Sequence, residues 1–348
     1  MSLPLGIGLV GLGHWGRNYL KTLLALPECR LVAVADPDPA ARAAVANSAS
    51  VTVCDSLEQL LSDPAVAATV IATPDRTHYH LAAAALAAGR DVLVEKPMTL
   101  STSEAETLAG QAEDSSRVLA VGHTAVYATD IESQRTRLDA IPQAAGRHVR
   151  AERTSSGPSS AHSPLASAAP VGQCAVRHSA ILFDLCPHDI ALAILLFGTP
   201  SAARARPKGN GVEYEVRFNG DELLEGWAEW REPPHVRRFE VNHGKGVQGF
   251  EGPGVRRWSP GTVRPRAPNS NPEARDPSSR PEIRDTPLGR QCLDFIECCR
   301  TRRQPLSSGS VGLAVMRCLA GLDLSCADSG AWVPLPDLVH RPSSVVQK

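Results

Sequence analysis

A glycine-rich turn between an apolar run and a leucine-rich segment sets the strongest limit on the fold of this chain. Residues 5–10 form a short apolar run, and Gly11-Leu-Gly-His-Trp-Gly16 follows it directly. Residues 14–26 then repeat leucines at helical spacing and stop before Pro27. A strand, a tight glycine turn and a helix in this order predict the start of a dinucleotide-binding α/β domain, in which phosphates lie at the helix N-terminus.

Each glycine of this turn has a separate expected role. Gly11 permits the tight turn, Gly13 lets a pyrophosphate approach the backbone, and Gly16 lets the helix pack closely on the strand. Asp36 ends the next apolar run, 20 residues after Gly16, where a carboxylate accepts hydrogen bonds from the ribose 2′-hydroxyl. Because that carboxylate would repel a 2′-phosphate, the sequence predicts NAD as the cofactor in preference to NADP.

Strand and helix patterns continue to alternate through the first third of the chain. They predict strands at residues 31–36, 66–72, 91–95 and 118–122, and helices at residues 40–47, 56–61, 77–88 and 103–112. Such alternation implies a parallel, doubly wound sheet, whose carboxyl strand ends face the cofactor. We therefore expect cofactor contacts from Thr73, Pro74 and His78, although His78 is equally interpreted as a helix N-terminal histidine without a ligand. His14 and Trp15 are expected beside the cofactor too, with core packing as the alternative for Trp15.

The bulk composition limits the class of protein. With 348 residues the chain is too long for one ordinary core, so we expect two domains, residues 1–125 and 126–348. A formal net charge of -1 favours neither nucleic acid nor an anionic membrane as a partner. The N-terminal residues lack a signal-peptide pattern, and no uninterrupted apolar run reaches the about 20 residues of a membrane span. The nine cysteines form no C-x-x-C pair, which predicts a cytoplasmic protein with reduced thiols and no metal site.

The pattern changes in the second half of the chain. Residues 147–154, 211–218, 223–230 and 237–243 read as strands, and Gly-Lys-Gly at 244–246 reads as a turn. Since no helical pattern separates the last three strands, we expect an α+β domain with a mainly antiparallel, open sheet. Residues 155–172 and 259–286 are rich in Ser, Pro or Arg and predict poorly ordered loops, although the first could instead cover a substrate.

Three motifs resemble those of one oxidoreductase family. They are Ala72-Thr-Pro-Asp-Arg-Thr-His78, Val94-Glu-Lys-Pro97 and Asp184-Leu-Cys-Pro-His-Asp189, and residues 287–296 and 309–330 extend the match over nearly the whole chain. Together they resemble the Gfo/Idh/MocA oxidoreductases, which include glucose-fructose oxidoreductase and inositol dehydrogenase. The third motif also resembles the subgroup that acts on nucleotide-linked amino sugars. The resemblance implies that the open sheet joins subunits into homodimers or homotetramers and that C-terminal helices can pack back on the Rossmann domain.

The resemblance also implies the catalytic residues. In this family the lysine of Glu-Lys-Pro and the histidine of Asp-x-x-x-His lie beside the nicotinamide, which assigns catalytic roles to Lys96, Asp184 and His188 and a cofactor contact to Glu95. Oxidation of a secondary alcohol needs a base for the hydroxyl proton, and imidazole is suited to it, while an ammonium group stabilises the developing alkoxide. Asp184 and His188 are four residues apart, so we expect them on one helix face. A solvated Lys96 and a surface Asp–His pair are the structural alternatives.

Three further residues are expected to join Lys96, Asp184 and His188 in binding the substrate. His123 ends the last strand of the Rossmann domain and Tyr127 follows it, so both are expected to face the cleft. Arg177 stands just ahead of the predicted catalytic helix and is the best candidate for a phosphate contact. An aromatic content of 4% offers few side chains for stacking on a nucleobase.

Several functions are compatible with these motifs. The leading hypothesis is an NAD-dependent dehydrogenase of a sugar hydroxyl, with a nucleotide-linked amino sugar as the favoured substrate. A cyclitol dehydrogenase, or a ketone or imine reductase of a biosynthetic pathway, is a second interpretation. A non-catalytic NAD-binding regulator is a third, and the presence of both Lys96 and His188 argues against it.

Overall fold

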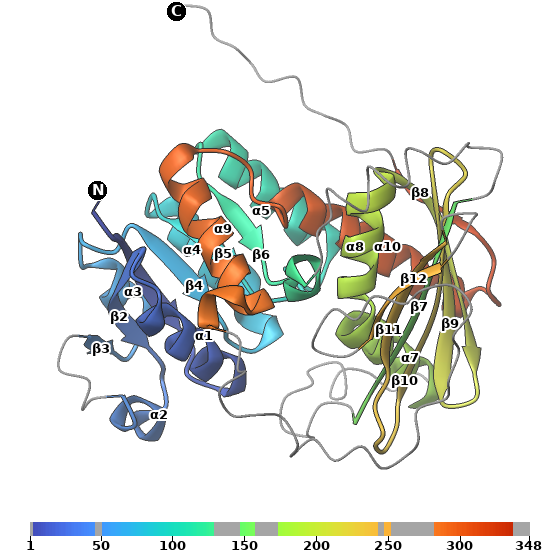
Figure 1. The fold of residues 1–348 in the computed structure, drawn as a ribbon, viewed down its shortest axis with the longest axis horizontal. Coiled ribbons are helices and arrows are strands. Elements are labelled where there is room, and N and C mark those ends of the chain that lie inside the picture. Colours follow the sequence, from blue (N-terminus) through green and yellow to red (C-terminus); the bar gives the residue numbers. More distant parts are fainter. Residues whose placement is uncertain are drawn as a thin grey trace, which may run out of the picture.

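The computed structural model describes residues 3–45, 51–128, 147–156, 173–242, 247–251 and 282–336. In this part of the chain two β-sheets stand side by side, with helices between them and helices on the first sheet (Figure 1). The interpretations of residues 157–172, 244–246 and 259–281 concern positions outside the described ranges.

The first sheet has six strands, all parallel, in the order β3-β2-β1-β4-β5-β6. The strands are β1 Leu5–Val10, β2 Cys29–Ala35, β3 Thr52–Cys54, β4 Ala68–Ile71, β5 Asp91–Val94 and β6 Leu119–Val121. The strand order reverses next to β1, so the carboxyl ends of β1 and β4 flank the crevice in which such a fold binds its ligands. The predicted doubly wound parallel sheet is thereby confirmed.

Helices cover both faces of the first sheet. They are α1 His14–Ala25, α2 Pro39–Ala43, α3 Leu57–Leu61, α4 His78–Ala87, α5 Thr102–Asp114 and, from the C-terminal part of the chain, α9 Pro287–Thr301. Ser56, Ser101 and Thr286 begin α3, α5 and α9, because their side-chain oxygens accept hydrogen bonds from the backbone three residues on. Apolar residues of α3, α4 and α5 share one core with the sheet, and those of α1 and α9 share another. Helix α9, from the C-terminal part of the chain, thus completes the helix layer on the second face of the sheet. The domain boundary expected after residue 125 falls inside a 3₁₀ helix, Thr124–Tyr127.

The second sheet has seven strands in the order β12-β11-β7-β10-β9-β8-β13. They are β7 His148–Ser155, β8 Pro200–Lys208, β9 Gly211–Phe218, β10 Leu223–Trp230, β11 Arg237–Asn242, β12 Val247–Glu251 and β13 Val333–Pro334. Strands β7 and β10 run parallel, and the other neighbouring pairs are antiparallel. The predicted mainly antiparallel sheet is thereby confirmed, and β7 lies between β10 and β11 within it.

The second sheet has an apolar inner face. Along β9, Val212, Tyr214, Val216 and Phe218 are buried, while the residues between them are more exposed. Three helices on the side of the first sheet cover this face, namely α7 Gln173–Leu185, α8 Pro187–Phe197 and α10 Gly309–Ala327 (Figure 1). Alternation along the strand therefore separates a core face from an outer face.

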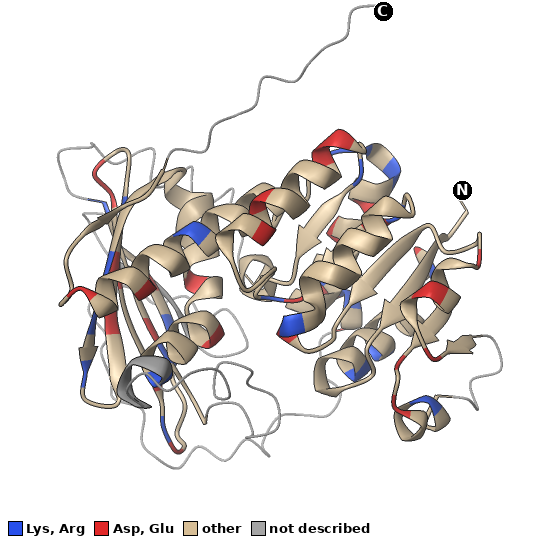
Figure 2. Ribbon diagram, turned by 180° about the vertical axis from the view of Figure 1, so that it is seen from behind, with Lys and Arg blue, Asp and Glu red and all other residues tan. Residues whose placement is uncertain are grey.

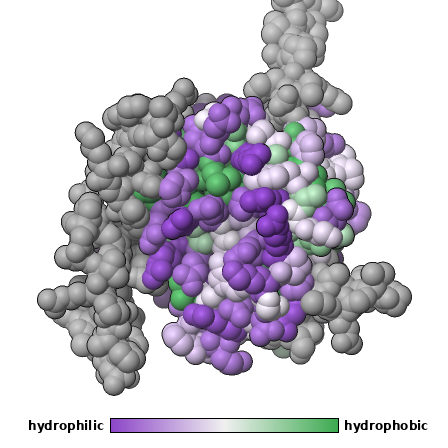
Figure 3. Space-filling view, turned by 90° about the vertical axis from the view of Figure 1, so that its right-hand side faces the viewer, coloured by the Kyte–Doolittle hydropathy of each residue, from purple (hydrophilic) through white to green (hydrophobic). Residues whose placement is uncertain are grey.

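The outer face of the second sheet carries charges in cross-strand pairs. Arg150 lies 3.1 Å from Glu225, and Arg204 lies 2.7 Å from Glu215. The described part of this side is mainly hydrophilic in Figure 3. Figure 2 shows basic and acidic residues interspersed over the two sheets, as the near-zero net charge requires.

By length and composition, α10 is the one described helix that could cross a membrane, and the bent pair α7 and α8 meets the same test only when taken together. Half of the apolar window of α10 is buried within the protein, where it packs against β8, α5 and α8. Its Arg317 and Asp323 bind Glu106 and Ser179 of neighbouring helices. We therefore interpret α10 as a core helix that connects the two sheets.

Candidate active site

The three glycines of the β1–α1 turn have different surroundings. Gly11 has a φ of +94°, and a Cβ there would lie 2.5 Å from the carbonyl oxygen of Ala72. A Cβ at Gly16 would lie 2.0 Å from the carbonyl oxygen of Gly11, whereas a Cβ at Gly13 would meet no atom within 4 Å. The turn and its packing therefore need Gly11 and Gly16, and Gly13 leaves open space at the N-terminus of α1, where a pyrophosphate fits.

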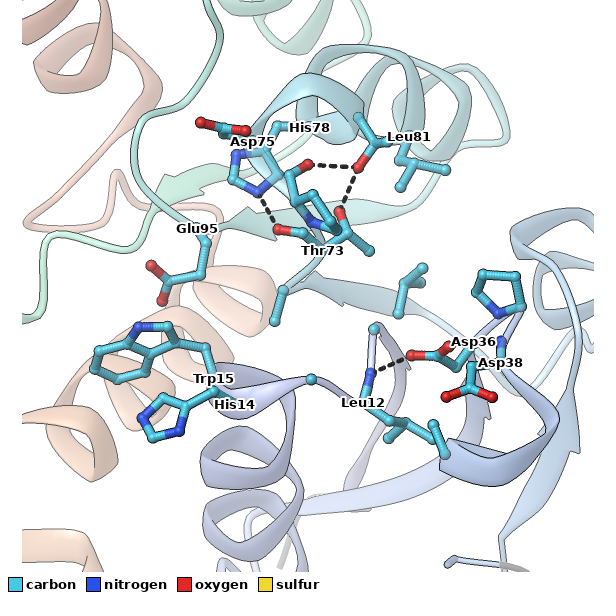
Figure 4. Close-up of a pocket in the computed structure, with 18 of the residues that line it drawn as sticks. Leu12, His14, Trp15, Asp36, Asp38, Thr73, Asp75, His78, Leu81 and Glu95 are labelled. Atoms are coloured by element: carbon cyan, nitrogen blue, oxygen red, sulfur yellow. Dashed lines mark hydrogen bonds between the residues drawn. The ribbon is translucent and has the colours of Figure 1, made fainter. Parts of the chain in front are cut away.

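Asp36 is held at the same crevice by backbone groups (Figure 4). Its Oδ2 accepts a hydrogen bond from the N–H of Leu12 at 2.7 Å, and its Oδ1 accepts one from the N–H of Asp38 at 2.9 Å. Arg42 donates to the carbonyl oxygen of Asp36 at 2.7 Å, which holds the loop after β2. Asp36 and Asp38 both line the cleft. Their two carboxylates would repel a negatively charged group, such as a 2′-phosphate, at the predicted ribose position.

His14 and Trp15 line the cleft at the start of α1. Their rings meet edge to face, with 6.1 Å between centroids. Trp15 is 42% exposed, so the alternative that it packs in the core is wrong. Both side chains are available to a ligand bound at this turn.

His78 links two loops at the edge of the first sheet. Its Nδ1 lies 2.7 Å from the carbonyl oxygen of Pro97, and its Nε2 lies 2.9 Å from that of Thr73 (Figure 4). The side chain is buried and borders the cleft together with Thr73 and Pro74. Because both ring nitrogens already face protein carbonyls, the geometry favours a role in holding these loops over a direct ligand contact.

Glu95 is buried beneath Lys96 in a chain of hydrogen bonds. Tyr19 donates its hydroxyl to Oε1 of Glu95 at 2.7 Å, the N–H of Lys96 donates to Oε2 at 3.1 Å, and Gln291 donates to the Tyr19 oxygen at 2.7 Å. Burial raises the pKa of Glu95, and the Tyr19 hydrogen bond and the Lys96 charge oppose that shift. Sequence reasoning missed Tyr19 and Gln291, because they lie on α1 and α9, which only the fold brings together.

Lys96 reaches from the first sheet to the end of α7. Its Nζ donates to the backbone oxygen of Asp184 at 2.7 Å and to Oδ1 of the same residue at 3.1 Å. Trp230 of β10 donates its indole N–H to Oδ2 of Asp184 at 3.1 Å. The last carbonyl groups of a helix lack partners within the helix and attract cations, which explains the position of the ammonium group. The Lys96 side chain is 15% exposed, which argues against a merely solvated lysine.

The helix expected to hold both Asp184 and His188 is broken between them. Helix α7 ends at Leu185 and α8 begins at Pro187, with a bend of 52°. Proline has no backbone N–H to donate and clashes with the preceding turn, so it ends one helix and suits the first position of the next. The expectation of one shared helix face is therefore wrong: Asp184 lies in the last turn of α7 and His188 in the first turn of α8.

His188 is half-buried, and its Nδ1 is buried without a hydrogen-bond partner in the described part of the chain. Burial lowers the pKa of His188 well below its ordinary value, and the charges of Arg153, Lys96 and Arg237 add to the shift. The ring meets that of His123 edge to face, with 6.3 Å between centroids. An imidazole in these surroundings is neutral near pH 7 and can accept a proton.

Asp189, the next residue, forms a buried ion pair with Arg153 of β7. Nε of Arg153 donates to Oδ2 of Asp189 at 2.9 Å, and Nη2 donates to Oδ1. The pair anchors the first turn of α8, and with it His188, to the second sheet. Sequence reasoning missed Arg153, because nothing in its local pattern distinguishes it from the other arginines of the strand.

Four predicted substrate contacts lie outside the lining of the cleft, namely His123, Tyr127, Arg177 and His188, although His188 follows the cleft-lining Asp184 by four residues. His123 is 1% exposed and its Nδ1 lies 2.8 Å from Oγ of Ser307. Tyr127 is buried and donates its hydroxyl to Asp294 at 2.8 Å. Direct substrate binding by His123 and Tyr127 is therefore not supported, because neither residue lines the cleft, the Tyr127 hydroxyl is bound to Asp294, and one of the two ring nitrogens of His123 is beside Ser307. Arg177 is exposed and lies inside α7 rather than ahead of it.

One cleft of about 1470 Å³ joins these parts. It extends from Asp36 at one end to Lys96 and Asp184 at the other. Single-ligand pockets have volumes of roughly 300–1,000 Å³, so this cleft is large enough for a dinucleotide and a second molecule. Its lining also includes residues that sequence reasoning did not identify, because separate elements supply them: Ser155, Ala180, Phe183 and Trp230.

Known proteins resemble this chain in sequence and in structure. A family model described as an oxidoreductase family with an NAD-binding Rossmann fold matches residues 5–123. The uncharacterized oxidoreductase YdgJ of Escherichia coli is 30% identical over 238 residues, which cover 62% of this chain and 61% of that protein. UDP-N-acetylglucosamine 3-dehydrogenase of Acidithiobacillus ferrooxidans is 32% identical over 191 residues, 55% of this chain and 54% of that enzyme.

The matches to these two curated relatives thus span less than two thirds of their lengths. Among solved structures, GenD2 from gentamicin A biosynthesis in complex with NAD superposes with a TM-score of 0.76 at 25% identity. That superposition covers 97% of this chain and 98% of GenD2. The similarity in structure therefore includes both sheets.

Proposed function

We propose that this chain, whose residues 5–123 match the model of an oxidoreductase family with an NAD-binding Rossmann fold, is a Gfo/Idh/MocA oxidoreductase and acts as an NAD-dependent dehydrogenase or reductase of a sugar. The observation that carries this proposal is the contact between Lys96 and Asp184. It joins the two parts of the chain within a cleft that has room for a cofactor and a substrate. The alternative of a non-catalytic NAD-binding regulator gives no reason for a lysine and a carboxylate to meet there.

The crevice of the first sheet suits NAD. The open space at Gly13 and the N-terminus of α1 would receive the pyrophosphate, and Asp36 would accept hydrogen bonds from the adenosine ribose. When bound, NAD supplies the acceptor for a hydride from a carbon that bears a hydroxyl group. Asp36 and Asp38 together favour NAD over NADP, because a 2′-phosphate would meet two carboxylates.

Proton transfer is assigned to His188. In the oxidation direction its neutral imidazole takes the proton of the substrate hydroxyl, and in the reduction direction the protonated ring returns it. The Lys96 ammonium stabilises the negative charge that develops on the substrate oxygen. Asp184 holds Lys96 in place and is still 35% exposed in the cleft, so it can also accept a hydrogen bond from a sugar hydroxyl.

A nucleotide-linked amino sugar is the substrate that we favour. The relative from Acidithiobacillus ferrooxidans is named for such a substrate, and the motif from Asp184 to Asp189 resembles the corresponding subgroup. The volume of the cleft is compatible with a substrate of that size. A cyclitol is the competing substrate class, and the experiment below separates the two.

The test is NADH formation by the full chain with UDP-N-acetylglucosamine, free N-acetylglucosamine and myo-inositol in parallel. We expect turnover of the UDP-sugar, and its loss in Lys96→Ala but not in Lys21→Ala, which changes an exposed lysine of α1. Turnover of inositol without turnover of the UDP-sugar would overturn the substrate class. Absence of turnover with every sugar and cyclitol, in protein that binds NAD, would overturn the proposed activity.

The outer face of the second sheet is proposed to join subunits into a homodimer or homotetramer. In the ribbon view the described helices next to the second sheet, α7, α8 and α10, lie on its inner side and leave this face without a helix (Figure 1). Trp227 lies on it at the centre of the sheet, between charged cross-strand pairs. Light scattering on the purified protein measures the assembly, and a monomeric mass at micromolar concentration would contradict this proposal.

A further inference from the structure

The inner face of the second sheet ends in two rows of side chains near the catalytic groups. In the first row Trp230 of β10 lies opposite Ser155 of β7, and both line the cleft. In the next row Ala228, Arg153 and Arg237 lie opposite one another on β10, β7 and β11. Because residues two apart on a strand share a face, both arginines are on the inner face with Ser155 and Trp230, one row beyond these cleft-lining residues.

Arg153 and Arg237 differ in their counter-charges. Like charges directly opposite each other on neighbouring strands are unfavourable unless each has an anion. Arg153 has Asp189, which is fully buried against it. Arg237 is exposed and has no hydrogen bond or ion pair from its guanidinium within the ranges that the structure describes. Partial desolvation and the Arg153 charge lower the pKa of Arg237, as expected for a cation that lacks a close anion.

Arg237 acts on the reacting groups through its charge. Its charge contributes to the lowered pKa of His188, and it is attracted to Asp184. The next residue, Arg238, lies on the outer face, where it pairs with Glu152 and Glu240. Adjacent arginines of one strand therefore differ: Arg238 has carboxylate partners on the outer face, whereas within the described ranges no carboxylate forms an ion pair with Arg237 on the inner one, where Asp189 and Asp184 attract it only from a distance.

We propose that Arg237 binds an anionic group of the substrate beside the reaction end of the cleft, one row beyond Ser155 and Trp230. A guanidinium donates two parallel hydrogen bonds to a phosphate or a carboxylate and does not lose its charge near neutral pH. The inference rests on the proposed function and deepens it, since the sugar must then carry an anion, either the diphosphate of a nucleotide or a carboxylate on the ring. Neither Arg177 nor Arg237 is among the residues that line the cleft, but Arg237 lies one row beyond Ser155 and Trp230, which do, so it replaces Arg177 in this role.

The experiment is equilibrium binding, without turnover, to the full-length protein saturated with NAD. Calorimetric titrations use UDP and glucuronate as probes, on the unmodified protein, Arg237→Gln and the matched control Arg238→Gln. We expect Arg237→Gln to weaken binding of one probe about tenfold or more, as loss of a charge-assisted hydrogen bond implies. Arg238→Gln should stay within about twofold, and Arg237→Lys should recover part of the affinity.

The outcomes distinguish a diphosphate from a ring carboxylate as the bound anion, and they distinguish failure of the anion site from failure of the proposed dehydrogenase activity. Weaker UDP binding assigns the site to a diphosphate, and weaker glucuronate binding alone assigns it to a ring carboxylate; both support the proposal. Unchanged affinities of a folded Arg237→Gln protein, or an equal loss in Arg238→Gln, would overturn it, and thermal unfolding checks the fold. Failure of the proposed function would give a different result: the protein would bind the anion through Arg237 but would form no NADH with any sugar or cyclitol.

Discussion

The two ends of the cleft are assembled in different ways. At the cofactor end, Gly13 and Asp36 belong to one strand–turn–helix–strand stretch, and the backbone N–H groups of Leu12 and Asp38 within that stretch and just after it hold the Asp36 carboxylate. At the reaction end, Lys96 binds Asp184, 88 residues away, and Trp230 binds the same carboxylate from 46 residues away. Local backbone geometry thus forms one end, and contacts between distant elements form the other, so mutations at the two ends should have separable effects.

The sharpest test of that separation is His188→Asn. We expect turnover to fall roughly 100- to 10,000-fold, the usual contribution of general acid–base catalysis. NAD affinity should stay almost unchanged, because Gly13 and Asp36 lie at the other end of the cleft. Steady-state rates and NAD titration on the same preparation measure both effects.

Lys96→Ala provides the companion measurement. Its loss of turnover should be of similar order, through lost stabilisation of the alkoxide, and the double variant with His188→Asn should lose less than the product of the two, since both groups serve one step. Near-full activity in a folded, NAD-binding His188→Asn protein would leave the proposed mechanism without a base.

The pH dependence of turnover sharpens the same assignment. Burial and the surrounding cations lower the pKa of His188 below its ordinary 6.5, so the neutral, proton-accepting form is present above that lowered pKa and is lost as pH falls through it. The acidic limb of the oxidation rate should therefore lie below pH 6.5 and disappear in His188→Asn. If the acidic limb of the pH–rate profile of the unmodified protein is centred above pH 7, His188 is not the base.

A stability measurement tests whether distant contacts hold the reaction end together. Arg153→Met leaves Asp189 buried and unpaired, which should lower the free energy of unfolding by about 3–5 kcal/mol. The matched control is Arg150→Met on the outer face of β7, where the exposed pair with Glu225 contributes about 1 kcal/mol or less. Urea denaturation followed by circular dichroism measures both, and equal effects would show that the buried pair does not anchor α8.

The smallest expected effect belongs to the cofactor end. Asp36→Ala should narrow the preference for NAD over NADP by about tenfold, the approximate contribution of one charge-assisted hydrogen bond. Turnover with saturating NAD should change little, because His188 and Lys96 are untouched. Competing titrations with both cofactors give the ratio, and equal affinity of the unmodified protein for NAD and NADP would refute the role of Asp36.

Local sequence patterns predicted the first sheet and its nucleotide turn closely. The helix expected at residues 14–26 is His14–Ala25, and the strand expected at residues 91–95 is Asp91–Val94. Pro187 could have predicted the helix break between Asp184 and His188, because it is the first residue of α8. The four-residue spacing of Asp184 and His188, taken alone, instead suggested a single helix. Tyr127 faces Asp294 rather than the cleft, which no pattern near Tyr127 could show.

The amino-acid sequence was sufficient to predict the parts of this protein whose backbone geometry depends on neighbouring residues. The glycine turn, the alternation of strands with helices and the acid at the end of β2 all depend on backbone conformation and side-chain period, which are local properties. Tertiary structure alone decided which arginine has an anion, which carboxylate Lys96 meets and where β7 enters its sheet. Those outcomes depend on which distant segments pack together, and packing is settled by the burial and pairing of the whole chain at once.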